Sequence, residues 1–94
     1  MLNQVILIGK LIQTYSEKNQ RYITLRIMSP PNTTDDYDII HCLVSDALVD
    51  YDDLFIVGSI IGVKGKVKSH LEHGYLTIEV LNATIIKRKE KDHE

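Results

Sequence analysis

The chain of 94 residues is 44% hydrophobic and 26% charged, which is enough for one small core and too little for two. Its formal net charge of -2 excludes polyanion binding through bulk positive charge, so such a partner needs a local cluster of basic side chains. The longest apolar run, residues 5–8, is far shorter than the roughly 20 residues of a membrane span, and the N-terminus shows no secretory signal. We therefore expect a soluble, cytoplasmic protein without a membrane partner. The single cysteine, Cys42, excludes an intrachain disulfide.

The first half of the chain predicts three β-strands. Residues 3–12 (NQVILIGKLI) are rich in branched aliphatic side chains around a glycine, as in a buried strand that bends or carries a bulge. After a polar connection at residues 14–20, residues 21–28 (RYITLRIM) alternate in polarity, which predicts a half-buried strand. A loop with adjacent prolines, residues 29–37, leads to a third strand at residues 38–44 (DIIHCLV).

The second half predicts one short helix and a hairpin. Ser45 is a typical helix N-cap, apolar residues follow at helical spacing, and Gly58 is a typical helix end. Residues 59–70 (SIIGVKGKVKSH) return to period two, with Ile61, Val63, Gly65 and Val67 expected to face the core. Residues 74–87 follow as the partner strand after a tight connection.

This order of elements indicates a fold. Five strands with one short helix between the third and fourth predict an all-β OB fold, a five-stranded Greek-key barrel whose second and third strands commonly bind oligonucleotides. The alternative, an SH3-like barrel, usually lacks a helix at that point. We expect residues 1–88 to form this domain and residues 89–94 to form a short charged end.

Four stretches carry a resemblance to a known family. They are NQVILIGKL at the start, YITLRI in the second strand, DIIHCLV in the third and GSIIGVKGKV in the fourth. In this order and at similar spacing, they resemble the N-terminal domain of bacterial single-stranded DNA-binding proteins over nearly the whole chain. The resemblance implies an OB fold, a homo-oligomer (a tetramer or a dimer) and sequence-tolerant binding of single-stranded DNA.

The chain departs from that family at the rings that stack on bases. The family's aromatic positions are occupied here by Ile39, Ser45 and, roughly, Pro31 and Glu72, none of which is aromatic. Because stacking contributes about 1 to 3 kcal/mol per base, their loss weakens the expected binding. The family's disordered, partner-recruiting C-terminal extension is also not expected here.

Three lysines are the main candidates for contacts with phosphates. Lys64, Lys66 and Lys68 alternate along one predicted strand, so they share one face at a spacing of about 6.6 Å. This spacing is close to that of phosphates in an extended single strand. The alternative is a solvated lysine row that only keeps the strand soluble.

Further basic and aromatic residues extend this candidate surface. We expect Lys10, Arg21 and Arg26 to lie on the exposed side of the first two strands. Arg26 beside Tyr22 offers a cation and a ring on the face that an OB fold presents to bases, although a cross-strand surface pair is the alternative. Two other rings, Tyr37 and Tyr75, are secondary stacking candidates or simple packing residues.

His41 and Cys42 do not form a metal site in this interpretation. Adjacent strand residues point to opposite faces, so we expect Cys42 in the core and His41 exposed on the binding face, in contact with a base or a phosphate. No other pattern has the spacing of a metal site, and neither a phosphate-binding glycine loop nor a nucleophile elbow occurs. We therefore expect no enzyme, no metal and no cofactor.

Two functions remain open on this basis. The first is non-enzymatic protection or organisation of single-stranded DNA in replication, recombination or repair, which the lysine row favours. The alternative is an assembly module of the same fold that resembles primosomal replication protein N and binds replication proteins, which the missing aromatic residues favour. In both cases the first strand, apolar on both faces, predicts a homo-oligomer.

Overall fold

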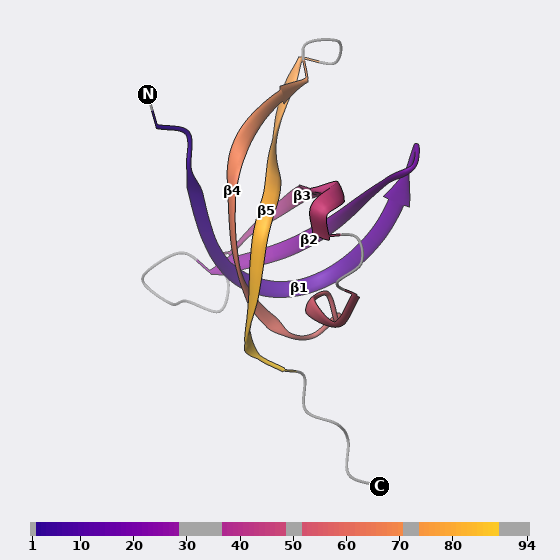
Figure 1. The fold of residues 1–94 in the computed structure, drawn as a ribbon. Coiled ribbons are helices and arrows are strands. Elements are labelled where there is room, and N and C mark those ends of the chain that lie inside the picture. Colours follow the sequence, from indigo (N-terminus) through magenta and orange to yellow (C-terminus); the bar gives the residue numbers. More distant parts are fainter. Residues whose placement is uncertain (1, 29–36, 49–51, 71–73, 89–94) are drawn as a thin grey trace, which may run out of the picture.

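A computed structural model describes residues 2–28, 37–48, 52–70 and 74–88, and its five strands close into a barrel (Figure 1). The strands are β1 (Val5–Glu17), β2 (Gln20–Met28), β3 (Tyr37–Val44), β4 (Ile60–His70) and β5 (Tyr75–Lys87). Around the barrel they follow the order β1-β2-β3-β5-β4, and only β3 and β5 pair in parallel. This topology confirms the predicted five-stranded OB barrel. The proposed boundary between residues 1–88 and 89–94 stays a prediction, because the charged end lies outside the described residues.

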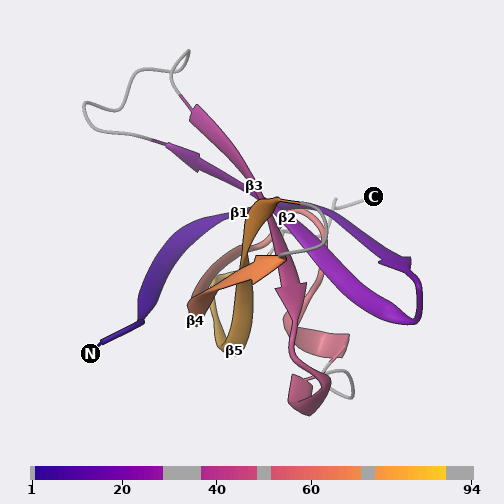
Figure 2. The same ribbon diagram turned by 90° about the horizontal axis from the view of Figure 1, so that it is seen from above.

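Strand β1 pairs with two neighbouring strands because it bends. Its first half pairs with β4 from Val5 to Lys10, and its second half pairs with β2 from Lys10 to Glu17. Figure 2 shows β1 curving across the molecule from the N-terminal end to the β1–β2 turn. At the bend, a Cβ on Gly9 would lie 2.8 Å from the Arg26 carbonyl oxygen, so only glycine lets the two backbones approach this closely. The predicted bend in the first strand is confirmed.

The connection between β1 and β2 is shorter than predicted. The polar residues 14–17 continue β1, and only Lys18 and Asn19 form the turn, both with positive φ (51° and 64°). Such a two-residue turn matches the right-handed twist of the flanking strands. The expectation of a polar connection from residue 14 was wrong because this arm extends beyond the core, so its strand carries polar side chains.

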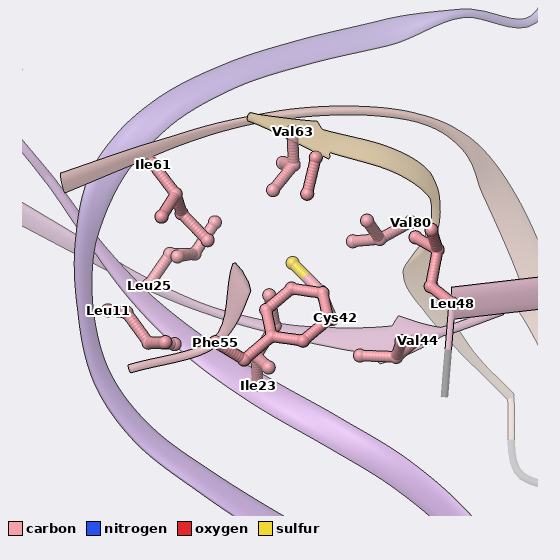
Figure 3. Packing of buried hydrophobic residues seen from close by; sticks show 11 residues of the cluster. Leu11, Ile23, Leu25, Cys42, Val44, Leu48, Phe55, Ile61, Val63 and Val80 are labelled. Atoms are coloured by element: carbon pink, nitrogen blue, oxygen red, sulfur yellow. The ribbon is translucent and has the colours of Figure 1, made fainter. Parts of the chain in front are cut away.

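The barrel interior holds an apolar cluster (Figure 3). Its buried members are Leu11, Ile23, Leu25, Cys42, Val44, Leu48, Phe55, Ile61, Val63, Val80 and Ala83. The predicted inward positions of Ile61, Val63 and Gly65 are confirmed, whereas Val67 is 39% exposed. Val67 differs because β4 and β5 remain paired as far as His70 and Tyr75, past the end of the closed barrel (Figure 1).

The segment between β3 and β4 closes one end of the barrel. Among the described residues, two short 3-10 segments, η1 (Asp46–Leu48) and η2 (Asp52–Leu54), lie where the helix was predicted, and their aspartates are weak helix formers. Ser45 caps η1 as predicted, since its Oγ accepts a hydrogen bond from the Ala47 amide (3.3 Å). Tertiary packing holds the segment, with Leu48 and Phe55 buried in the core. None of the described helical segments is long and apolar enough to span a membrane.

Candidate nucleic-acid interface

The side chains that alternate with the core residues form the outer face of the barrel. On β2 and β3 the outward pairs are Tyr22 with Leu43, Thr24 with His41, and Arg26 with Ile39. The face continues onto β5, where Glu79 lies between Leu43 on β3 and Lys66 on β4. Most of the residues that sequence reasoning proposed for binding lie on this outer face.

Three rings gather on the outer face where β1, β2 and β3 meet, and we call Tyr15, Tyr22 and His41 the aromatic cluster. The Tyr15 and Tyr22 rings are stacked, with centroids 5.2 Å apart and an interplanar angle of 11°. The His41 ring meets Tyr15 edge-on, with centroids 6.2 Å apart. The Tyr22 hydroxyl also donates to Gln20 Oε1 at 3.1 Å. The stacked pair stands on β1 and β2 rather than at the family's aromatic position on β3, which is Ile39 here.

A hydrogen-bond chain orients His41 within this cluster. The buried Thr24 hydroxyl donates to Gln13 Oε1 (3.3 Å) and lies 3.0 Å from His41 Nδ1. Because that hydroxyl has only one proton to donate, we assign the Nδ1 proton to His41 as the donor to Thr24. In the neutral ring, Nε2 is then an acceptor that suits the N–H groups of a base. The predicted exposure of His41 on this face is confirmed.

A groove of about 590 Å³ runs beside the aromatic cluster. It lies where β3 and β5 separate beyond their short parallel pairing, which covers only Cys42–Val44 and Ile78–Val80. Exposed aliphatic side chains contribute much of its wall, including Ile39 (44% exposed) and Leu76 (70% exposed). The lining residues are Tyr15, Glu17, Tyr22, Ile39, Ile40, His41, Val67, Leu76, Thr77 and Ile78.

The three lysines share one face of β4, as predicted, but an acid accompanies two of them. Lys66 Nζ lies 3.7 Å from Glu79 Oε1, and Lys68 Nζ lies 3.8 Å from Glu79 Oε2. Lys64 lies opposite Asn82 rather than opposite an acid. Sequence reasoning missed Glu79. The predicted tight connection between the two strands would have indicated the register that places Glu79 opposite Lys66.

A second group of predicted residues meets further along the outer face. Lys10 is the cross-strand neighbour of Arg26, and the Arg26 guanidinium lies over the Tyr37 ring, with its carbon 5.4 Å from the ring centroid. The stacking partner of Arg26 is therefore Tyr37, whereas Tyr22 stacks on Tyr15. The structure brings together Lys10, Arg26 and Tyr37. Sequence reasoning had grouped Lys10 with Arg26 but had named Tyr37 apart from them.

One predicted residue lies apart from this arrangement, and the side chain of another is not described. Arg21 has the inward parity of Ile23, and its guanidinium lies over the Phe55 ring, 5.3 Å from the centroid. Its expected place beside Arg26 was wrong, because neighbours an odd number of residues apart on a strand face opposite sides. Tyr75 begins β5 opposite His70, but its side chain lies outside the described residues.

Tyr15 is the functional candidate whose importance sequence reasoning missed. A two-residue turn at Lys18 and Asn19 sets the register that places Tyr15 directly opposite Tyr22. The signal was therefore present in the turn, but residues 14–20 were interpreted as a connection without register.

Cys42 and His41 face opposite sides of β3, as predicted. Cys42 is fully buried, and burial raises the pKa of its thiol from 9.0 to about 11. A thiol that stays protonated at neutral pH is a poor nucleophile and metal ligand. Among the described residues, no three His, Cys, Asp or Glu side chains are placed to hold a metal ion.

A further apolar surface lies on the outside of β1, β4 and β5, with Lys64 of the lysine row at its edge, opposite Ile6. Ile6, Ile8 and Ile86 are 66%, 58% and 53% exposed and surround Gly62, and we call these residues the isoleucine patch. Leu7, between two of them, packs on the core instead. The first strand is therefore apolar on both faces, as predicted.

Solved structures share this fold. The chain is similar to the N-terminal domain of PriB from Thermoanaerobacter tencongensis, a dimeric structure (TM-score 0.69, 18% identity, 92% of this chain and 98% of that chain). It is also similar to the mitochondrial single-stranded DNA-binding protein Rim1 of S. cerevisiae (TM-score 0.71, 9% identity, 93% and 98%). A third similar structure is a small single-stranded DNA-binding protein from Mycoplasma pneumoniae (TM-score 0.63, 17% identity, 98% and 100%). No protein-family model and no curated protein sequence matches the chain. The chain thus has the OB fold of these small proteins along nearly its whole length.

Proposed function

We propose that this protein binds single-stranded DNA on its outer face, without catalysis, and protects or organises it in replication, recombination or repair. The observation that carries the proposal is the stacked pair of Tyr15 and Tyr22, which lines the same groove as His41. Solved proteins of the same fold that bind single-stranded DNA support it. The cytoplasm is the compartment in which we place this activity.

The two kinds of contact have distinct roles in this proposal. Bases stack against the aromatic cluster and the aliphatic groove walls, at about 1 to 3 kcal/mol per base for a good stacking contact. Phosphates contact the lysine row and the pair of Lys10 and Arg26. Since every base has an apolar face and every nucleotide a phosphate, this arrangement tolerates any sequence. The cluster of cations on one face also accounts for how a protein of net charge -2 attracts a polyanion.

The proposal is tested by binding of fluorescent oligo-dT to the wild type, Tyr22→Ala and Tyr22→Phe, measured by anisotropy over a range of salt concentrations. We expect Tyr22→Ala to weaken binding about tenfold or more because it removes one stacked ring. Tyr22→Phe keeps the ring and loses the hydroxyl with its bond to Gln20, so it should bind within about threefold of the wild type. Wild-type protein that binds no oligo-dT at low salt would refute the proposal.

We also propose that the protein forms a homo-oligomer through the isoleucine patch. Three exposed isoleucines and a glycine make an apolar surface, which a second copy would remove from water. The dimeric PriB domain of the same fold supports this arrangement. A dimer and a tetramer both use such a surface.

The alternative function, an assembly module that binds replication proteins, is favoured by the groove walls. Ile39, Val67 and Leu76 are exposed aliphatic side chains that suit a protein partner as well as bases. This alternative becomes the better proposal if the wild type binds no oligo-dT at low salt while Leu76→Lys abolishes binding to a replication protein.

A further inference from the structure

Glu79 is an acid in the middle of the proposed phosphate surface. Its two carboxylate oxygens are shared between two lysines, with Oε1 near Lys66 (3.7 Å) and Oε2 near Lys68 (3.8 Å). On a surface that binds a polyanion, a carboxylate repels the ligand. A carboxylate at this position should therefore weaken DNA binding.

The geometry holds the acid in place and leaves the lysines movable. The Glu79 side chain is 18% exposed, whereas the side chains of Lys66 and Lys68 are 47% and 43% exposed. Glu79 lies between Lys66 on β4 and the buried Leu43 on β3, in the middle of the sheet. The lysine ammonium groups stand at the ends of flexible, solvated stems and are able to leave the carboxylate without any change in the backbone.

A carboxylate and a phosphate offer a lysine the same kind of partner, an anionic oxygen. We propose that Glu79 is an internal competitor for ligand phosphate, which occupies Lys66 and Lys68 in the free protein and is displaced from them by bound DNA. This inference rests on the proposed function. It assigns Glu79 the control of affinity rather than a contact with DNA.

Such a competitor has two consequences. Exposed ion pairs at these distances are weak, so a strand with several adjacent phosphates displaces Glu79, whereas a single phosphate gains little by doing so. The acid also keeps the two ammonium groups in a row on β4 while no ligand is bound. Glu79 thus sets a threshold of charge density that a ligand has to exceed.

The test measures oligo-dT affinity at low salt for the wild type and the isosteric variant Glu79→Gln. We expect Glu79→Gln to bind about five- to tenfold more tightly, since both lysines become available and the repulsion disappears. Asp53→Asn is the matched control, because it removes the same charge from an exposed position on η2 rather than from the lysine row. It should change affinity less than about twofold.

A second background separates competition from general repulsion. In the variant Lys66→Ala with Lys68→Ala, Glu79 has no lysine to occupy, so adding Glu79→Gln should no longer raise affinity. Circular dichroism melts check that each variant folds, and Glu79→Ala serves in place of Glu79→Gln if the glutamine variant does not.

The possible results are distinct. A gain in Glu79→Gln that persists without the two lysines, or that Asp53→Asn reproduces, overturns the competitor role and leaves DNA binding intact. If the wild type binds and Glu79→Gln binds no more tightly, the competitor role is also overturned and DNA binding is left intact. A gain in Glu79→Gln that requires the two lysines and that Asp53→Asn does not reproduce supports the inference. If the wild type binds no oligo-dT, the proposed function fails, and the inference fails with it.

Discussion

Two glycines occupy points where a neighbouring strand leaves no room for a side chain. At Gly9 the obstacle is the Arg26 carbonyl, and at Gly65 an added Cβ would overlap the Glu79 carbonyl oxygen opposite the bulge in the β4–β5 ladder. Gly62, on the same strand as Gly65, has no such backbone obstacle. The nearest atoms to an added Cβ would belong to the side chains of Ile86 and Ile8, with Ile86 Cδ1 closest at 3.3 Å, and not to backbone.

We therefore expect Gly65→Ala to lower the free energy of unfolding by about 2 kcal/mol or more, because backbone has to move to admit the methyl group. Gly62→Ala is the matched control, but Gly62 lies in the isoleucine patch, so both substitutions are compared in a monomeric background such as Ile8→Lys. There Gly62→Ala should stay within about 0.5 kcal/mol of its parent. Urea denaturation at equal protomer concentration measures both. Equal losses of unfolding free energy in the two variants would show that the close approach of the backbones at Gly65 does not limit stability.

The buried thiol of Cys42 predicts a pH dependence of stability. Its pKa rises from 9.0 to about 11 in the folded state, so folding favours the protonated form. The resulting stability is fully present below pH 9 and is lost as the pH rises through about 11, since the unfolded chain then gains by releasing the proton. Between these values the wild type should lose stability more steeply than Cys42→Ala, whose other titrating groups are the same. Parallel unfolding curves of the two proteins across this range would contradict the assignment.

At the scale of elements, the β1–β2 hairpin sets the register of the aromatic cluster. Its turn places Lys18 and Asn19 at positive φ, a conformation that is unfavourable for residues with a Cβ and that asparagine tolerates better than lysine. The same turn pairs Glu17 with Gln20 and, two residues further from the turn on each strand, Tyr15 with Tyr22.

Replacing Lys18→Asn together with Asn19→Gly should therefore stabilise the protein by about 1 kcal/mol, because Asn-Gly is the preferred pair for a two-residue hairpin turn. Thermal melting measures the gain, and Lys18→Ala, which keeps a Cβ at positive φ, should show none. The near-ultraviolet signal of the stacked tyrosines should remain unchanged. A loss of that signal would mean that the register has shifted and that Asn-Gly does not fit this turn.

At the scale of the whole molecule, two apolar surfaces face away from the core, and they have different proposed partners. The groove wall with Leu76 belongs to the ligand surface, and the isoleucine patch belongs to the interface between copies. A charged substitution on each surface separates these roles.

We expect Ile8→Lys to convert the oligomer into monomers at micromolar concentration, because a lysine in the centre of an apolar interface leaves a charge without water or a partner. Ile8 is 58% exposed in the single chain, so the protomer itself should remain folded. Leu76→Lys makes the same kind of change on the other surface and should leave the oligomer intact. Sedimentation equilibrium measures both, and a monomeric wild type would refute the proposed interface.

Local patterns in the sequence determined the strands of this protein and the faces on which most side chains lie. Period-two alternation predicted the strands, the outward lysine row and the opposite orientations of His41 and Cys42, because side-chain direction along a strand depends only on position. A glycine within an aliphatic run predicted the bend of the first strand. The same alternation also assigned Arg21 to the inward side, although the sequence interpretation placed it beside Arg26.

Only the tertiary structure decided which side chains meet when they are remote in sequence, as where Arg21 meets Phe55. The pairs of Tyr15 with Tyr22 and of Glu79 with Lys66 follow instead from the registers of the β1–β2 and β4–β5 hairpins. The neighbour of Glu79 on β3, Leu43, is remote in sequence and adjacent only because β3 and β5 pair in parallel. Periodicity gives the face of a strand on which a residue lies, whereas its neighbours across strands depend on register and strand order, which are set by closing the barrel around one core.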